Sequence, residues 1–562
     1  MIASIIPPSE GRTRFQVREI AGAAIALAIG FHFLALRIRA GGLPTGDEGS
    51  WMSVAAELAH GHGFATRWLE AHFLVPYALP RPDDFRYPAL TSLLALSFRL
   101  FGFSIETARW TVGAVFLVFA TAVWGVSRAA FGRWAAQAAL WATVTSLLQL
   151  EWNSAVYTEG LFGLAAAGLA AWCLRGERQR GSAAPFAFGT HAWWAGLGAM
   201  IGLLYLVRVN AILFLPGVPW LWFRRRDEPL RWTHPALAML AFFLIAAPWL
   251  LRSAFAFGNP FHFAGSGGLL RDPGSVLTQS HTLTAAEYFR RHDVFFFPRR
   301  LILGAAHLFR DLHRCEHGLE AAPLILALWG LFRRRPFFGP AFAAGFLLTS
   351  LACAFAAYNS WAGVRYFSGV APLLYAYGFS QIPIAAAGIP PRFFPQGRFP
   401  PRLRFSAGAA GIALVLAPVA FPHRYYERVL TGALAAAGPY AYRPAVAEHL
   451  AKLTRDVPPG GDYYAASLCN LNFLAPDRFC VGLQELYDPS WYPRSVAAFH
   501  PAWVALTRPE MVDSALKAAL GRMRDGGYTP VTVDSGSLAR YLALRQDAVP
   551  LSFDTVRPWK SP

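Results

Sequence analysis

Charged residues are scarce in this chain, and lysine is almost absent. Charged residues make up 15% of the 562 positions and hydrophobic residues 55%, and mean hydropathy is +0.34. Soluble domains are less apolar, so this composition excludes an ordinary soluble protein and predicts a polytopic membrane protein. The three lysines, Lys452, Lys517 and Lys560, all lie in the C-terminal part and indicate a compositional boundary near 422–440.

Motifs that bind nucleotides or metal ions are missing as well. The sequence has no P-loop, no GxGxxG motif at the start of a helix, and no His or Cys cluster at metal-ligand spacing. His60, His62 and His72 are a weak metal signal, because the third lies far from the first two. We therefore predict no cofactor; the sequence allows a divalent cation but does not indicate one.

Long apolar stretches dominate the sequence instead. A helix needs about 20 apolar residues to cross a hydrocarbon core of roughly 30 Å. Eleven stretches approach this length, and the short loops between them alternate between arginine-rich and arginine-poor. The predicted spans lie near 19–38, 108–127, 135–151, 157–174, 192–207, 209–223, 235–251, 319–332, 337–357, 364–385 and 405–421.

One further apolar stretch, 88–102, decides the orientation. It begins at Pro88 and carries Arg99. If it does not cross, all the arginine-rich loops fall on one side, which the positive-inside rule identifies as the cytoplasm. We therefore predict a juxtamembrane or re-entrant helix there, a cytoplasmic N-terminus, and a multi-pass protein of a bacterial inner (plasma) membrane, since arginine in place of lysine is typical of GC-rich bacterial genomes. The net charge of +18 is then mainly a topology signal, with some help in holding anionic membrane lipid, and requires no nucleic acid.

Three long segments fall on the extracytoplasmic side, where function is expected: 39–107, 252–318 and 422–562. The last has no spanning stretch, and it alternates short apolar runs with helical patterns. We predict an α-helical membrane domain over 1–421, with about eleven transmembrane helices plus juxtamembrane helices, and a small extracytoplasmic α/β domain over 422–562. The apolar runs are DYYAAS, RFCVGL, AWVALT and TPVTV; the helical patterns are AVAEHLAKL, VDSALKAALGRM and SLARYLALR.

The five cysteines are divided between these parts. Cys173 and Cys353 fall in predicted spans, and Cys315 in a predicted extracytoplasmic loop. Cys469 and Cys480 lie in the C-terminal domain, where an oxidising compartment would permit a disulfide. Two buried thiols are the alternative, and the sequence does not choose between them.

Two acidic sites stand out on the extracytoplasmic side. Asp47 and Glu48 follow Gly46 at the start of a helical pattern, where the helix dipole favours their ionised forms. A general base for a hydroxyl acceptor has to be ionised, and close to the lipid surface if its other substrate is a lipid. Glu159 begins the fourth span. The alternatives are a helix-capping acid with a solvated neighbour, and an interfacial glutamate that reaches to water.

Four arginines lie on the predicted extracytoplasmic side, where the positive-inside rule predicts few positive charges, so their presence needs an explanation. They are Arg86, Arg208, Arg252 and Arg365, and each is next to an apolar segment. Arginine keeps its charge when it is partly desolvated and donates two parallel hydrogen bonds, as binding a phosphate at a membrane surface would require. For each of them, pairing with a structural carboxylate is the alternative.

The order of the short motifs resembles the GT-C superfamily of polytopic glycosyltransferases. The similarity covers roughly residues 15–385 and is greatest to the protein O-mannosyltransferase and lipid A aminoarabinose transferase branch. The motifs, in order, are GDEGSW, FRYPAL, TARW, YTEGLF, GLLYLVRVNAILFLP, APWLLRSAFAFGNPF and GVRYFSGVAPLL.

This resemblance implies a donor sugar linked to polyprenyl phosphate and transfer, with inversion, to a hydroxyl of a lipid, glycan or protein acceptor outside the cytoplasm. The family's general base matches Asp47, with Glu48 beside it as helper or substitute. Its second acid matches Glu159, although aspartate is common at that place in the family.

The resemblance also implies a donor phosphate site. Arg86, in FRYPAL, occupies the place of a basic residue that contacts the donor phosphate in the lipid A branch; YPAL here replaces the frequent YPPL. Arg252 and Arg365 match further landmark arginines, which we assign to the same phosphate.

Two other functions fit a similar scaffold. A non-catalytic lipid or glycan transporter should lack the first-loop acid, whereas a polymerase or ligase of lipid-linked glycans should have a large acceptor-binding loop, for which 252–318 is long enough. The sugar, the acceptor, the linkage and the oligomeric state are not readable from the sequence.

Overall fold

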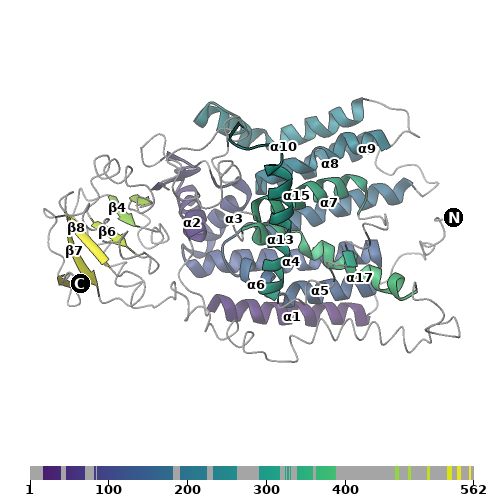
Figure 1. The fold of residues 1–562 in the computed structure, drawn as a ribbon, viewed down its shortest axis with the longest axis horizontal. Coiled ribbons are helices and arrows are strands. Elements are labelled where there is room, and N and C mark those ends of the chain that lie inside the picture. Colours follow the sequence, from purple (N-terminus) through teal and green to yellow (C-terminus); the bar gives the residue numbers. More distant parts are fainter. Residues whose placement is uncertain are drawn as a thin grey trace.

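A helical bundle forms most of the described structure, and a β-sheet lies beyond one end of it, next to α2 and α3 (Figure 1). The computed structural model describes most of the chain up to residue 387 and a set of strands beyond it. The described residues are 17–39, 46–69, 81–180 except Asp84, 190–224, 232–262, 290–316, 338–357 and 362–387, isolated positions between 323 and 330, and six strands between 463 and 558.

Four described helices are long and apolar enough to cross a membrane: α1 (Val17–Arg39), α4 (Ile105–Phe131), α8 (Thr190–Val207) and α10 (Thr233–Phe257). Further helices pack against α4, α8 and α10 in a large hydrophobic core, and α1 contributes to a second, smaller cluster. These include α7 (Glu159–Arg180), α15 (Pro340–Ala357) and α17 (Ala371–Ala387). The multi-pass membrane prediction is therefore confirmed.

Three predicted spans are not single helices, which corrects the sequence analysis. Hydropathy detects apolar length but not a helix start or a turn inside an apolar run. Ser146 is such a start, because its side chain accepts a hydrogen bond of 3.1 Å from Gln149 N. The interrupted spans are 135–151, which forms α5 (Arg133–Thr145) and α6 (Leu147–Asn153); 209–223, which forms the 3₁₀ helix η2 (Val209–Phe214) and α9 (Gly217–Arg224); and 364–385, which forms α16 (Ala362–Ser368) and α17.

The predicted long loop 252–318 also contains regular structure. α10 continues through its beginning and ends at Gly258, which has a positive φ of 70°. Its last part is the amphipathic helix α13 (Phe296–Glu316), which contacts α15. The predicted spans 319–332, apart from isolated positions, and 405–421 lie outside the described residues, so the total of eleven spans stays a prediction.

The segment between α1 and α4 carries two helices and a short antiparallel pair of strands. These are α2 (Gly46–Ala59), the antiparallel pair β1 (Ala65–Thr66) and β3 (Arg81–Pro82), and α3 (Pro88–Phe101). At 1.5 Å per residue, 14 residues of α3 span about 21 Å, which is less than a hydrocarbon core. A hydrogen bond also explains why this apolar helix contains Arg99. The Arg99 Nε donates a hydrogen bond of 2.8 Å to the Ala59 carbonyl oxygen at the end of α2.

A mixed seven-stranded sheet forms the described part of the C-terminal region, in the order β2-β5-β4-β6-β8-β7-β9. The four predicted apolar runs are strands: β4 (Tyr463–Ala466), β5 (Phe479–Gly482), β6 (Trp503–Leu506) and β7 (Tyr528–Val533). The helical prediction for SLARYLALR is wrong over β8 (Tyr541–Arg545), because antiparallel pairing with both β6 and β7 overrides local propensity. The other two helical patterns lie outside the described residues, so the α/β class stays a prediction.

The edge strand of this sheet comes from the N-terminal half of the chain. β2 (Trp68–Leu69) pairs in parallel with β5, with Trp68 opposite Cys480 and Leu69 opposite Val481. At the other edge, β9 (Val556–Pro558) pairs with β7. The loop that carries α2 is thus joined to the C-terminal sheet by backbone hydrogen bonds. Cys469 lies outside the described residues, so the choice between a disulfide with Cys480 and two buried thiols stays open.

Candidate active site

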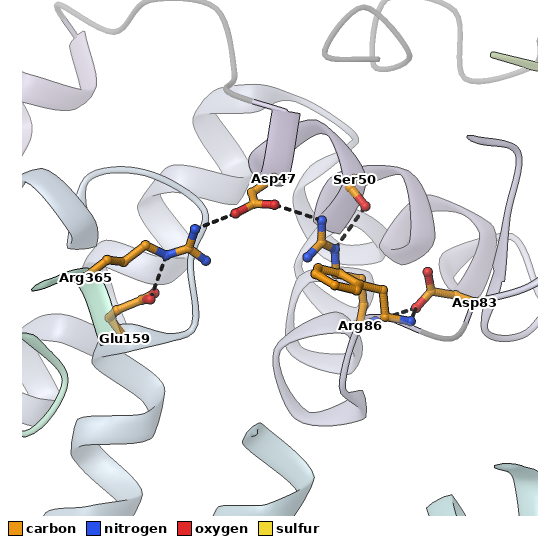
Figure 2. Close-up of polar contacts among 7 residues, drawn as sticks. Asp47, Ser50, Asp83, Arg86, Glu159 and Arg365 are labelled. Atoms are coloured by element: carbon orange, nitrogen blue, oxygen red, sulfur yellow. Dashed lines mark hydrogen bonds and ion pairs between the residues drawn. The ribbon is translucent and has the colours of Figure 1, made fainter. Parts of the chain in front are cut away.

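Asp47 lies in the first turn of α2, between two arginines from distant parts of the chain (Figure 2). Its Oδ1 accepts a hydrogen bond of 3.2 Å from Arg86 Nη2, and its Oδ2 accepts one from Arg365 Nη1. The Asp47 side chain keeps 34% of its surface exposed, so a substrate can reach the carboxylate.

The two guanidinium groups keep Asp47 ionised. Burial alone would raise the pKa of the Asp47 carboxyl, but the positive charges of Arg365 and Arg86 outweigh this effect and hold the pKa well below its usual range. Asp47 therefore carries its negative charge at neutral and mildly acidic pH. It is able to accept a proton, but the paired arginines make it a weak base in this state.

Arg86 is held from several sides and is 2% exposed. Its Nε donates 2.9 Å to Ser50 Oγ, one turn after Asp47 in α2. Asp83 fixes the backbone, because its Oδ2 accepts hydrogen bonds from Arg86 N at 2.6 Å and Phe85 N at 3.2 Å. The guanidinium also lies 4.2 Å from the centre of the Phe85 ring. These contacts aim the Arg86 guanidinium at Asp47.

Arg365, in α16, joins Asp47 to Glu159. Its Nε donates 2.9 Å to Glu159 Oε1, and its guanidinium lies 4.2 Å from the centre of the Tyr157 ring. The same Glu159 oxygen also accepts a hydrogen bond of 3.1 Å from Arg208 Nη2. Glu159 is fully buried, so an acceptor cannot touch it in this structure. Its carboxylate instead orients the two arginines.

Two glycines allow α7 to approach the turn after α16 closely enough for this contact. A Cβ atom added at Gly163 would lie 2.5 Å from the Gly369 carbonyl oxygen, and one at Gly369 would lie 3.0 Å from the Glu159 carbonyl oxygen. Two polar atoms in the neighbourhood, Glu159 Oε2 and Arg208 Nη1, are buried without a hydrogen-bond partner. The close backbone contact thus determines the distance between Glu159 and Arg365.

Glu48 is buried on another side of α2 and is 1% exposed. Arg109 of α4 donates to both of its oxygens, from Nε at 3.1 Å and from Nη2 at 3.3 Å. Val156 N donates 2.9 Å to Oε1. These bonds tie α2 to α4 and to the segment between α6 and α7. The structure therefore does not bring Glu48 together with Asp47 at the exposed site.

Arg252, near the end of α10, braces the loop that carries Arg86. Its Nη2 donates 2.8 Å to the Phe64 carbonyl and 2.7 Å to the Asp83 carbonyl. The guanidinium lies 4.5 Å from the centre of the Trp249 ring. Arg252 thus supports Arg86 through Asp83.

Of the six residues predicted for the site, the structure joins four in one chain of ion pairs: Asp47, Arg86, Arg365 and Glu159. The sequence analysis did not assign the partners that position them. Arg208 was one of the four candidate arginines, and the structure shows the alternative considered for it, pairing with a carboxylate, that of Glu159. Arg109 is part of the TARW motif. Two other partners have only weak signals in the sequence. Ser50 lies one helical turn after Asp47, and Asp83 is an aspartate that could form an Asx turn before Arg86. The residues that the sequence analysis did not assign to the site are Ser50, Asp83 and Arg109.

The first-loop histidines give no further support to a metal site. His62 Nδ1 lies 2.9 Å from Glu57 Oε2, and Glu57 also accepts 2.7 Å from Arg67 Nε. His72 lies outside the described residues. Within the part of the chain that the structure describes, no three His, Cys, Asp or Glu side chains come together as metal ligands do.

Comparison with known proteins gives matches in sequence and in structure. A family model described as dolichyl-phosphate-mannose-protein mannosyltransferase matches residues 86–251, which include Arg86, Arg109, Glu159 and Arg208. A search of curated proteins found no match.

Two solved structures cover most of the chain. The crystal structure of ArnT from Cupriavidus metallidurans bound to undecaprenyl phosphate is 18% identical, with a TM-score of 0.52, and the alignment covers 93% of this chain and 97% of that one. The oligosaccharyltransferase AglB from Archaeoglobus fulgidus, in complex with an inhibitory peptide and a dolichol-phosphate, is 13% identical, with a TM-score of 0.57, and the alignment covers 95% and 75% of the two chains. The resemblance found in the sequence is confirmed by the family model and these two structures together: the chain has the fold of the GT-C superfamily of membrane glycosyltransferases.

Proposed function

We propose that this protein transfers a sugar from a polyprenyl-phosphate donor to a hydroxyl group of a lipid, glycan or protein acceptor. The supporting observation is the accessible Asp47 carboxylate between two guanidinium groups. A base and an anion site are thereby adjacent, as this reaction requires. That the ArnT and AglB structures contain undecaprenyl phosphate and dolichol-phosphate supports the choice of donor.

In the proposed reaction Asp47 takes the proton of the acceptor hydroxyl. The acceptor oxygen forms a bond to the anomeric carbon from the face opposite the phosphate, so the configuration inverts. The bond between that carbon and the phosphate oxygen breaks, and its electron pair stays on the phosphate. Arg86 and Arg365 stabilise the charge that develops there, so no general acid is needed for the leaving group.

The remaining predicted residues act through these. Glu159 orients Arg365, and Arg252 supports the loop that carries Arg86, so both are positioning residues in this proposal. Glu48 fixes α2 through Arg109. The catalytic and phosphate-binding groups are then Asp47, Arg86 and Arg365.

We further propose that the reaction takes place on the extracytoplasmic side of a bacterial plasma membrane. The arginine-rich loops support this orientation, because they then lie in the cytoplasm together with the N-terminus. The region 422–562 would lie on the same side as Asp47, and the pairing of β2 with β5 supports that arrangement.

The test measures consumption of lipid-linked sugars. Membranes carrying wild-type protein, Asp47→Asn or Glu106→Gln are incubated with a panel of radiolabelled polyprenyl-phosphate sugars and an extract that supplies acceptors. We expect wild type to consume one donor and Asp47→Asn to do so at least about 100-fold more slowly, because the general base is lost. Glu106→Gln removes a carboxylate from the exposed first turn of α4, away from Asp47, and should leave the rate close to wild type.

Two results would contradict the proposal. Equal consumption by wild type and Asp47→Asn would show that Asp47 is not the base. Movement of an intact lipid-linked glycan across the membrane, with its phosphate bond unbroken in every incubation, would support the transporter instead.

A further inference from the structure

Both arginines that would bind the donor phosphate are engaged by the proposed base. Arg86 Nη2 contacts one oxygen of Asp47, and Arg365 Nη1 contacts the other. In this state the carboxylate occupies one terminal nitrogen of each guanidinium group and neutralises charge that the phosphate needs, and the guanidinium groups reduce the basicity that the carboxylate needs. The two functions therefore cannot operate at full strength while these ion pairs are intact.

The two arginines have the same arrangement of contacts. Each is held through Nε by a group other than Asp47: Arg86 by Ser50 Oγ at 2.9 Å, and Arg365 by Glu159 Oε1 at 2.9 Å. Each contacts Asp47 through a terminal nitrogen. The terminal nitrogens can thus exchange one anion for another while the Nε bonds keep the guanidinium groups in place.

We propose that the donor phosphate and the Asp47 carboxylate compete for the same terminal nitrogens of Arg86 and Arg365, so that donor binding releases Asp47 to act as the base. This inference rests on the proposed function and adds an order of events to it. The donor binds first and displaces the carboxylate, and the freed carboxylate then receives the acceptor hydroxyl. Without the donor, the base stays paired and weak.

The charge changes during transfer fit this exchange. The acceptor proton moves to Asp47, which becomes neutral. The electron pair of the broken carbon–oxygen bond moves to the phosphate, which gains a second negative charge. At that moment both arginines favour the phosphate. When Asp47 loses its proton to water, the carboxylate competes again and helps to displace the polyprenyl phosphate. Asp47 would then serve in product release as well as in proton transfer.

The competition predicts that loss of the base strengthens binding of the lipid phosphate. Full-length protein in detergent is titrated with undecaprenyl phosphate, and the dissociation constant is measured by calorimetry for wild type, Asp47→Asn, Asp47→Ala and Asp47→Glu. We expect Asp47→Asn and Asp47→Ala to bind on the order of tenfold more tightly, as for a typical coupling between two ligands of one site. Asp47→Glu keeps a competing carboxylate and should remain near wild type.

Three controls separate competition at the arginines from other causes of a change in affinity. Glu106→Gln removes the same charge from the exposed first turn of α4 but leaves the Asp47 ion pairs intact, so its affinity should equal that of wild type. Undecaprenol has no phosphate and should bind all variants equally. Inorganic phosphate separates the two sources of the anion: it should show the same rank order of variants, with weaker binding because it has no lipid tail.

The inference would be overturned by equal or weaker undecaprenyl phosphate binding in both Asp47→Asn and Asp47→Ala. Equal tightening in Glu106→Gln would also overturn it, because the effect would then be one of net charge alone. These outcomes are distinct from failure of the proposed function. Tighter binding in the Asp47 variants without any sugar transfer by wild type would retain the competition and reject the transferase. If sugar transfer requires Asp47 but the Asp47 variants bind undecaprenyl phosphate with unchanged affinity, the transferase is retained and the competition is rejected.

Discussion

At the scale of single residues, Asp47 and Glu48 are neighbours in sequence whose carboxylates have different surroundings. Successive side chains on a helix point about 100° apart, so one reaches the exposed end of α2 while the other enters the core. Asp47 keeps 34% of its surface and Glu48 about 1%. Exposure therefore separates a group that can contact substrate from one that holds the helix.

This difference predicts distinct effects of the two amide substitutions. Glu48→Gln should lower the free energy of unfolding by about 3–5 kcal/mol, because it leaves the buried Arg109 guanidinium without its counter-charge. Asp47→Asn should lower it by less, because Asp47 is one-third exposed to solvent and Arg365 keeps its ion pair with Glu159. Thermal unfolding in detergent, followed by tryptophan fluorescence, measures both. A Glu48→Gln protein as stable as wild type but without sugar transfer would assign Glu48 to the chemistry instead.

Sequence reasoning could select the candidate residues but not their pairing. Asp47, Arg86 and Arg365 stand out because each is a charged residue next to an apolar segment. Their ion pairs join residues 39 and 318 positions apart, which depends on how the helices pack. Ser50 and Asp83 were missed because a serine in a helix and an aspartate before a turn are common everywhere.

At the scale of elements, the contact between α7 and the turn after α16 sets the geometry of Glu159 and Arg365. Both sides of this contact are backbone, since Gly163 faces the Gly369 carbonyl. Backbone cannot move aside as a flexible side chain can, so an added methyl group would separate the two elements.

Gly163→Ala should therefore reduce sugar transfer by at least about tenfold and destabilise the protein by about 1–3 kcal/mol, because its Cβ would lie 2.5 Å from the Gly369 oxygen and 2.4 Å from the Phe119 ring. Gly125→Ala in α4 is the matched control, since nothing lies within 4 Å of its added Cβ. Initial rates and thermal unfolding of both variants provide the comparison. Equal rates would mean that the spacing of α7 and α16 does not position Arg365.

Elements were easier to predict than their interruptions. Apolar length correctly locates the long helices α1, α4, α8 and α10, because crossing a membrane requires an uninterrupted run. The breaks at Ser146 and before α17 arise from a helix cap and a turn inside apolar sequence, which hydropathy does not detect. SLARYLALR is helical by pattern, but part of it forms β8 because two neighbouring strands pair with it.

At the scale of the whole molecule, the pairing of β2 with β5 connects the loop of the candidate site to the C-terminal sheet. Trp68 lies opposite Cys480 in a parallel register. The same loop contains Asp83 and Arg86, and Arg252 holds it from α10. Any movement of the sheet relative to the bundle would therefore pull on the loop that positions Arg86.

A disulfide tests this connection. In a Cys469→Ser background, Trp68→Cys should form a disulfide with Cys480 under mild oxidation, because the two positions are opposite one another in the ladder. Leu69→Cys is the control, since neighbouring positions of a strand face opposite sides. Mass spectrometry of linked peptides measures both, and transfer activity should survive the link. Linkage at neither position, or equally at both, would contradict the register.

The origin of β2 also has a consequence for how the protein is made. A chain grows from its N-terminus, so β2 is synthesised roughly 400 residues before the strand it pairs with. During that interval every later helix has to insert while the backbone of β2 waits without its partner. The loop that holds Asp47 and Arg86 is therefore translated well before β5 but matures only after β5 has been made. A chain released early by the ribosome would carry the candidate base and one of its arginines, but it would lack the strand that secures their loop.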